Sequence, residues 1–318
     1  FLVLTLLFTA QAADDGGICE VLNLKTCSGI AKQSRRSSGQ SLPSNASAAS
    51  FNPAAVSHDR GFGVETMYQP GQSPTLTLVT GTGRAGAALV STNLENSFFG
   101  NRVIELDDDF LRRRKDKDQF KSDKKALAFG VALYKNRNFS VDLGLMGKYN
   151  SDIKQFNPGA GLSMRVWVFT FGASSYRDDV YIKFRDQVDP NTGQTYSFSQ
   201  DHYQERFNVQ NYFVGVRIKN LFLDAAQMHT RYKVFNTDTV ETKIYSAAYI
   251  WNKFLFNLAL RREDSPMWGY KHGKLVDKRI KNDVYYGLQY AFSRYVILGL
   301  HHNYYLLNEV AMSATVFF

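Results

Sequence analysis

The sequence predicts an all-β protein, a transmembrane antiparallel β-barrel of about 14 strands with an N-terminal plug in its lumen. Three features predict the barrel. Apolar and polar residues alternate along many segments, short and long connections follow one another, and the 318 residues include 24 Phe and 18 Tyr. Membrane barrels turn apolar residues to lipid and polar ones to the lumen, and carry aromatic side chains at both interfaces. Because the two faces cancel, a mean hydropathy of -0.30 is compatible with this fold.

The last segment shows the alternation most clearly. Val310, Met312 and Val316 fall on one face of an extended chain, and Ser313 and Thr315 fall on the other. The same pattern predicts strands near 61–69, 74–81, 84–93, 125–134, 138–148, 157–165, 167–177, 204–217, 220–231, 239–251, 253–263, 282–292, 294–304 and 309–318. We therefore expect residues 61–318 to form the barrel wall.

Two points leave the strand count open. No turn signal separates 157–165 from 167–177, so a barrel of 12 strands is the alternative to 14. Residues 178–203 alternate around a good turn sequence at 189–193, which predicts a hairpin projecting beyond the membrane, although this stretch could also belong to the wall.

The connections give an independent check on the count. Short turns at 81–84, 135–137, 219–220, 252–253 and 293–294 alternate with longer or more polar links, notably 94–124, 178–203 and 264–281. Outer-membrane barrels have short periplasmic turns and long extracellular loops. An even count places both ends of the wall in the periplasm.

The first residues predict export. Residues 1–10 form an apolar run too short to cross a bilayer, and Ala10-Gln11-Ala12 fits the small-residue pattern of a signal-peptidase site. We expect residues 1–12 to be the remnant of a signal peptide, cleaved after Ala12. Localisation in the bacterial outer membrane follows from export combined with a barrel.

The two cysteines predict a disulfide. Cys19 and Cys27 are the only cysteines of the chain, and the periplasm is oxidising. Two thiols without a nearby His would leave a zinc ion half-ligated, so no metal site is expected. Nothing in the sequence indicates another cofactor.

The net charge of +9, from 38 Lys and Arg against 29 Asp and Glu, raises the question of nucleic acid. The basic residues are spread through turns and mixed runs such as 112–118, which does not give the basic surface that nucleic acid requires. The expected partners are outer-membrane lipids, including lipopolysaccharide phosphates, or an anionic cargo in the lumen.

Residues 13–60 come before the first strand and are rich in Ser, Ala and Gly. Within them, the small-residue run 47–55 contains Asn52, Pro53 and Ala54 and is followed by Gly61-Phe62-Gly63-Val64-Glu65. In these residues the chain resembles the outer-membrane long-chain fatty-acid and hydrocarbon transporter family. That resemblance implies a 14-stranded barrel with an N-terminal hatch in the lumen.

The resemblance implies passive uptake of a hydrophobic or amphipathic small molecule such as a long-chain fatty acid, by a monomer without catalytic residues. Basic side chains on inner faces are candidates to hold an anionic head group; they are Lys148, Arg217, Arg261 and His301. Asp142 and Asp224 fall on inner faces too, so these charges could instead neutralise one another.

Other functions stay open. Asn-Pro-Ala before a strand also occurs in barrels that serve secretion systems, and a surface scaffold or adhesin needs no further sequence feature. A lipid-modifying enzyme would need a Ser/His pair near a strand rim, and His301 and His302 lie near a predicted extracellular strand end. The chain has no Gly-x-Ser-x-Gly nucleophile motif.

Overall fold

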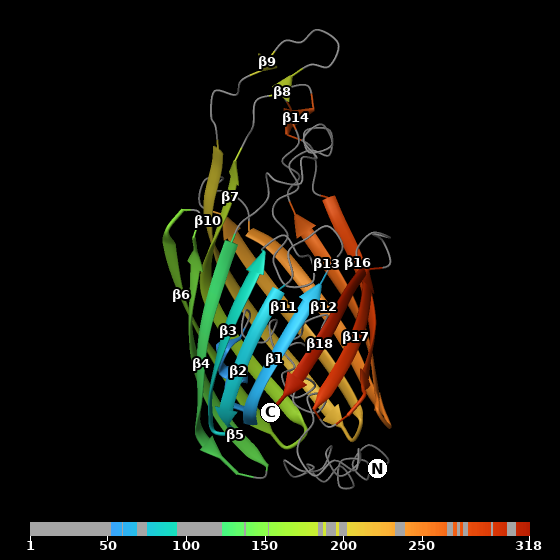
Figure 1. Ribbon diagram of the computed structural model, residues 1–318. Coiled ribbons are helices and arrows are strands. Elements are labelled where there is room, and N and C mark those ends of the chain that lie inside the picture. Colours follow the sequence, from blue (N-terminus) through green and yellow to red (C-terminus); the bar gives the residue numbers. More distant parts are fainter. Residues whose placement is uncertain are drawn as a thin grey trace.

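The computed structural model shows a closed antiparallel barrel of 14 strands with one short helix inside it (Figure 1). The structure describes residues 52–58, 60–68, 75–93, 123–136, 138–151, 153–183, 187–188, 195–196, 202–232, 239–265, 270–271, 274–275, 279–293, 295–303 and 310–318. The predicted signal peptide, Cys19 and Cys27 lie outside these residues.

The elements follow one another along the chain as η1(Pro53–His58), β1(Arg60–Tyr68), β2(Thr75–Thr82), β3(Ala85–Asn93), β4(Asp123–Lys135), β5(Phe139–Asn150), β6(Gln155–Val166), β7(Phe169–Lys183), β8(Gln187–Val188), β9(Thr195–Tyr196), β10(His202–Ile218), β11(Leu221–Tyr232), β12(Thr239–Trp251), β13(Phe254–Ser265), β14(Tyr270–Lys271), β15(Lys274–Leu275), β16(Arg279–Ala291), β17(Val296–Asn303) and β18(Val310–Phe317). Each wall strand pairs with the wall strand next in sequence, and β1 closes the barrel by pairing with β18.

The 14-strand prediction is confirmed and the 12-strand alternative is wrong. The chain reverses between β6 and β7 in a tight turn in which Trp167 has a φ of 53°. This left-handed conformation is uncommon for residues other than Gly, Asn and Asp, so the sequence carries no turn signal there.

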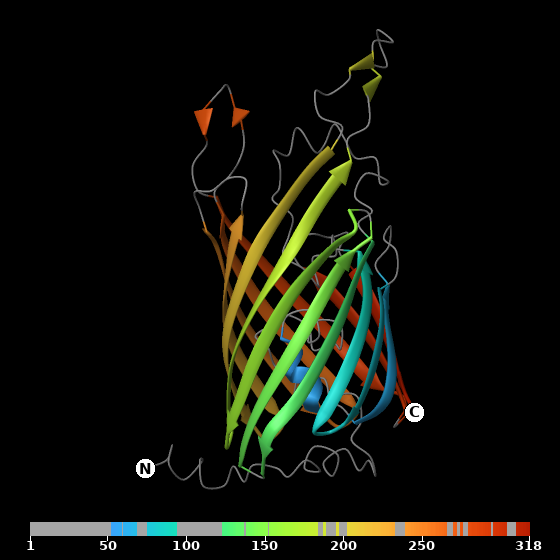
Figure 2. The same cartoon turned by 90° about the vertical axis from the view of Figure 1, so that its left-hand side faces the viewer.

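β7 and β10 are longer than the alternation predicted. Their pairing continues to His202 and Lys183, and β8 and β9 form a separate two-stranded sheet beyond it. β14 and β15 form a second small hairpin at the same end of the barrel (Figures 1 and 2). The start of the stretch 178–203 is therefore wall, and a hairpin lies beyond it.

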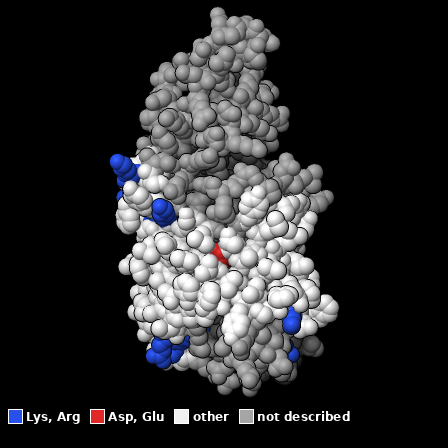
Figure 3. Space-filling model, viewed as in Figure 1, with Lys and Arg blue, Asp and Glu red and all other residues white. Residues whose placement is uncertain are grey.

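Side chains alternate between the two faces of the wall as predicted. On β5, Asp142 and Lys148 are buried in the lumen, whereas Leu143 and Leu145 are exposed on the outside. Figure 3 shows the outer face over β1, β17 and β18, which carries almost no charged side chain across its middle. An apolar outer face of this kind suits lipid.

Aromatic side chains form a girdle at the end of the barrel with the short turns. Phe62 lies 5.8 Å from Phe318 between ring centroids, and Phe254 lies 4.9 Å from Tyr290. Aromatic side chains exposed near the opposite strand ends are Tyr68, Tyr149 and Phe156, and Tyr212, Tyr245 and Tyr286 are exposed nearer the middle of their strands. Two girdles with an apolar band between them, on a closed barrel with an even strand number, are the architecture of the bacterial outer membrane.

Among the described residues, no helix has the length and apolar character needed to span a membrane. The C-terminus lies at the end of the barrel with the short turns (Figure 1). This is the end that the loop lengths predict to be periplasmic.

Candidate functional site: the barrel lumen

The short helix η1 lies inside the barrel, against the inner faces of β2 to β6 (Figure 2). The side chains of this segment are almost completely shielded from solvent, with Asn52, Ala54 and Ser57 all 0% exposed. The structure thus places Asn52, Pro53 and Ala54, predicted as a hatch element, against the lumen wall.

A row of glycines on the wall lets the backbone of this segment approach closely. Gly86, Gly130, Gly144 and Gly161 pair in register across β3, β4, β5 and β6, and we call them the glycine row. A Cβ on Gly130 would lie 2.7 Å from the backbone nitrogen of Ser57. A Cβ on any of the other three would overlap atoms of residues 52–56. Only glycine leaves room there for the helix backbone.

Polar contacts hold both ends of the segment. Asn52 Oδ1 accepts a hydrogen bond from the Ala54 backbone nitrogen at 3.2 Å, and the Asn52 carbonyl accepts one from Ala55 at 3.1 Å. At the other end, Ser57 Oγ donates to Asp142 Oδ1 at 2.9 Å, while Ser140 Oγ donates to Asp142 Oδ2 at 3.2 Å. Asp142 is therefore a wall residue that binds the helix, a role that its inward position alone did not predict.

Lys148 is one half of a buried ion pair. Its Nζ lies 3.1 Å from Asp178 Oδ2 and 3.9 Å from the centre of the Tyr176 ring. Both charged side chains are at most 10% exposed. For Lys148, mutual neutralisation of lumenal charges is therefore what the structure shows.

Asp179, the next residue along β7, joins a second polar group. It accepts a hydrogen bond from the Asn157 amide of β6, and Arg206 Nε of β10 lies 3.4 Å from Asp179 Oδ1. The backbone nitrogen of Asp179 donates to Asp178 Oδ1 at 2.9 Å. Two adjacent carboxylates are thus buried at one place in the wall, each with its own cation.

An apolar row crosses the opposite part of the lumen wall. Phe213 of β10, Ala226 of β11 and Ile244 of β12 are neighbours in register, and the next residue in this row is Arg261 of β13. All four are at most 6% exposed. The Phe213 ring packs over Gly172 of β7, where a Cβ would overlap it. We call the first three residues the apolar row. The guanidinium group of Arg261 lies next to its last residue, Ile244.

Arg217 lies lower in the barrel. It is half-buried, and its guanidinium carbon is 5.3 Å from the centre of the Phe222 ring. Phe222 belongs to a buried apolar cluster of inward residues with Ile250, Leu255, Ala291, Ile297 and Phe317. This cluster makes the periplasmic end of the lumen apolar along β11 to β18.

His301 is 1% exposed, and its Nε2 lies 3.1 Å from Ser313 Oγ of β18. Gly287 and Gly299 make room for the ring, since a Cβ on Gly287 would overlap Nδ1. The same Cβ would lie 2.6 Å from Asn257 Oδ1.

The four predicted head-group residues therefore lie at separate places in the lumen, and Arg261 alone adjoins the apolar row.

The inward positions follow from the sequence, but the contacts between them do not. The glycine row, the pairing of Lys148 with Asp178 and the apolar row all depend on which residues face each other across strands. Glycines inside four predicted strands were the available signal for a close contact. No cluster of His, Cys, Asp and Glu that could hold a metal ion occurs within the described part of the chain.

No protein-family model matches the chain, and no curated protein matches it. Solved structures are similar in fold. The CymD monoaromatic hydrocarbon channel is 10% identical over 86% of this chain and 93% of that chain, with a TM-score of 0.48. A Pseudomonas aeruginosa FadL homologue is 12% identical over 90% and 97%, with a TM-score of 0.47. The Ralstonia pickettii toluene transporter TbuX is 10% identical over 86% and 94%, also with a TM-score of 0.47.

Proposed function

We propose that the protein is a passive outer-membrane channel for hydrophobic or amphipathic small molecules, with the segment around η1 as its hatch. The observation that carries this proposal is the apolar row that ends on Arg261. Barrel lumens are usually polar, and a hydrophobic solute gains nothing from entering a polar one. Here three apolar side chains stand side by side on the inner wall.

The geometry of the row suits an amphipathic cargo. Neighbouring strands lie about 4.8 Å apart, so the line from Phe213 to Arg261 spans about 14 Å. An alkyl chain or aromatic ring along this line would bury its apolar surface against Phe213, Ala226 and Ile244. A carboxylate at its end would meet a guanidinium, the side chain best suited to bind a carboxylate in two places.

The hatch role is inferred from the position of η1 against the inner wall of the barrel. A 14-stranded barrel is wide enough to leave a bore unless something fills it. Asn52 to Ser57 cover the inner faces of five strands. We propose that this segment excludes small polar solutes and moves when a hydrophobic cargo passes. The similar channels CymD and TbuX are described as carrying monoaromatic hydrocarbons and toluene, which is the same broad class of cargo.

We also propose that one chain suffices. Since β1 pairs with β18, the wall has no free strand edge that a second copy would need to cover. A molar mass measured by light scattering in detergent should equal that of one chain with its detergent.

Uptake into liposomes tests the channel. The purified, refolded protein is compared for entry of a fluorescent long-chain fatty acid, a neutral aromatic hydrocarbon and a small sugar. We expect both hydrophobic solutes to enter and the sugar to stay out. Ile244→Asn should slow both hydrophobic solutes at least fivefold, whereas the conservative Ile244→Leu should not.

A substitution at Arg261 tests whether the channel handles the anionic and the neutral cargo differently. Arg261→Met should slow the anionic fatty acid and leave the neutral hydrocarbon unchanged, because only the fatty acid carries a carboxylate. Deletion of residues 13–60 should admit the sugar. If neither hydrophobic solute enters with the full-length or the deleted form, the transport proposal is wrong and a surface scaffold or secretion-associated role takes its place.

The contact between His301 and Ser313 favours a second candidate function, hydrolysis of a lipid ester. A histidine that is hydrogen-bonded to a serine hydroxyl can activate that hydroxyl as a nucleophile. The near-complete burial of His301 argues against this candidate. A fluorophosphonate probe decides: we expect no labelling, and labelling that is lost in Ser313→Ala would replace the channel by an enzyme.

A further inference from the structure

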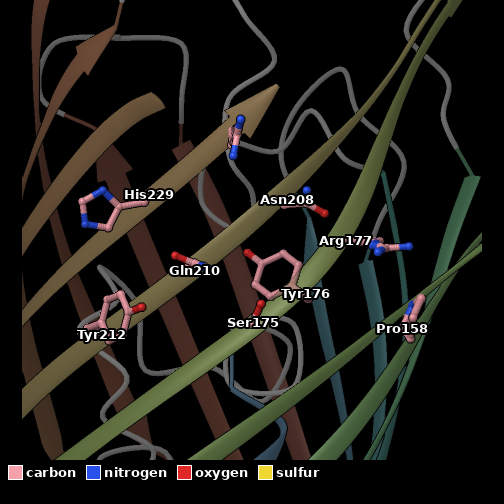
Figure 4. Close-up of a pocket in the computed structure, with 9 residues that line it drawn as sticks. Pro158, Ser175, Tyr176, Arg177, Asn208, Gln210, Tyr212 and His229 are labelled. Atoms are coloured by element: carbon pink, nitrogen blue, oxygen red, sulfur yellow. The ribbon is translucent and has the colours of Figure 1, made fainter. Parts of the chain in front are cut away.

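The outer wall carries a cationic groove above its apolar band. The groove has a volume of about 620 Å³ and is lined by Pro158, Ser175, Tyr176, Arg177, Asn208, Gln210, Tyr212, His229 and Arg231 (Figure 4). All of these except Tyr176 belong to the outward-facing set of β6, β7, β10 and β11. Their direction follows from their neighbours: Tyr176, Phe207 and Thr230, each one residue away, are buried in the lumen.

The register arranges the polar side chains in two rows. Asn208 pairs with Arg177 on one side and with Arg231 on the other, so two guanidinium groups flank one amide. One step closer to the apolar band, Gln210 pairs with Ser175 and His229 in the same way. Figure 4 labels five of these six side chains and shows them on adjacent strands; they are Ser175, Arg177, Asn208, Gln210 and His229.

The charge of the groove has one sign. Two arginines line it, and its described lining contains no Asp or Glu. Arg177 and Arg231 form no ion pair with residues that the structure describes. The nearby carboxylates are engaged elsewhere: Asp179 by Asn157 and Arg206, and Glu241 by Lys243 at 3.1 Å.

The height of the groove is that of the outer lipid headgroups. On β7, Phe169 lies in the lower aromatic girdle and Phe171 and Ala173 continue the apolar face upward to Ser175 and Arg177. Eight residues at about 3.3 Å each, on a strand tilted by about 40°, rise roughly 20 Å, close to the roughly 25 Å height of the apolar band. Arg177 therefore stands where acyl chains give way to headgroups. Tyr212 pairs with Ala173, four residues farther down the strand, so its half-exposed outward side chain lies at the level of the acyl chains.

The other side of the barrel lacks this feature. From Phe62 to Tyr68 of β1 and along β17 and β18, the described outward residues include Phe62, Val64, Leu298, Leu300 and Met312 and no Lys, Arg, Asp or Glu. Figure 3 shows this face with its Lys and Arg side chains at the margins and a single small acidic patch near the middle. The cationic groove is thus not part of a continuous ring around the barrel.

We propose that the groove binds the phosphorylated headgroup of a glycolipid of the outer leaflet, the lipid A part of lipopolysaccharide. Arg177 and Arg231 bind phosphate oxygens, the amides of Asn208 and Gln210 donate to the sugar and phosphate oxygens, and Tyr212 contacts the start of the acyl chains. Guanidinium groups suit this task because they bind phosphate with two parallel hydrogen bonds. This inference does not depend on what passes through the lumen.

Retention of lipid A by the full-length chain tests the site. The protein is incubated in detergent with bisphosphoryl lipid A, and bound lipid is counted by native mass spectrometry. We expect wild type to retain one lipid A and the double variant Arg177→Gln/Arg231→Gln to retain it at least fivefold less. Arg84→Gln, which removes an exposed arginine at the periplasmic end, is the matched control and should bind like wild type.

Further ligands and a second variant complete the experiment. Phosphatidylglycerol and inorganic phosphate should be retained more weakly than lipid A, since neither offers two phosphates on a sugar. If the double glutamine variant does not fold, Arg177→Lys/Arg231→Lys keeps the charge without the paired donors, and it should bind lipid A less than wild type does. Equal retention by wild type and variants, or retention of inorganic phosphate alone, would overturn the proposal, whatever the uptake assay shows.

Discussion

Gly144 and Ala54 are in backbone contact: a Cβ on Gly144 would overlap the amide nitrogen of Ala54. Residue 54 precedes the barrel wall and residue 144 lies in the middle of β5, so this contact fixes the N-terminal segment to the lumen wall.

The contact predicts that adding one methyl group at Gly144 displaces η1 from the lumen wall. Because the overlapping atoms are backbone, Gly144→Ala forces η1 to move, while the strand itself accepts alanine readily. We expect sugar entry into liposomes to rise severalfold, with a normal electrophoretic shift on heating as evidence of a folded barrel. Gly159→Ala is the matched control, because its Cβ would meet Tyr176 and Met146 and not η1. Equal leakage of the two variants would show that η1 does not block the lumen.

Asp142 predicts a graded loss of stability. Asp142→Ala removes the acceptor of two buried hydroxyls, those of Ser57 and Ser140, and should lower the free energy of unfolding by about 1–3 kcal/mol. Ser140→Ala removes only one of these bonds and leaves η1 bound, so it should cost about 1 kcal/mol. Urea unfolding in vesicles, followed by tryptophan fluorescence, measures both. Sugar leakage should rise in Asp142→Ala alone; a leak of the same size in Ser140→Ala would contradict the role of Ser57.

The pair of Lys148 and Asp178 predicts strong coupling. Lys148→Met leaves a carboxylate at 5% exposure without its cation and should cost about 3–5 kcal/mol. Asp178→Asn should also destabilise, and the double variant should recover most of the loss, because an uncharged pair needs no counterion. A double-mutant cycle of urea unfolding measures the coupling. Additive effects of the two single changes would mean that the ion pair contributes nothing.

Lys219 predicts a stabilising change in a periplasmic turn. Its φ of 51° is a left-handed conformation that costs a side chain about 1 kcal/mol, so Lys219→Gly should raise the free energy of unfolding by about that amount. Asn252 has a similar φ of 53° in another turn, but asparagine tolerates it. Asn252→Gly should therefore raise the free energy of unfolding by clearly less. An equal rise in the two variants would show that the left-handed φ of Lys219 is not the cause.

Local patterns in the sequence were enough to predict the wall. A strand exposes alternate residues to opposite faces, so inward positions such as Asp142 and Lys148 follow from their neighbours alone. The turn at Trp167 was not predictable, because its left-handed φ is imposed by the strands on either side of a residue without such a preference. The upward extension of β7 and β10 was missed because their pairing continues through polar residues beyond the membrane.

The contacts between residues far apart in the sequence depend on how the strands pair. The sequence alone determined a membrane barrel, its strand number within two, its inward and outward faces and the Asn-Pro-Ala segment ahead of it, because these depend on residues close together in the chain. Only the tertiary structure decided that Gly144 meets Ala54, that Lys148 meets Asp178, and that Arg177 and Arg231 flank Asn208. Register sets such contacts, and register depends on how each strand settles against its neighbours.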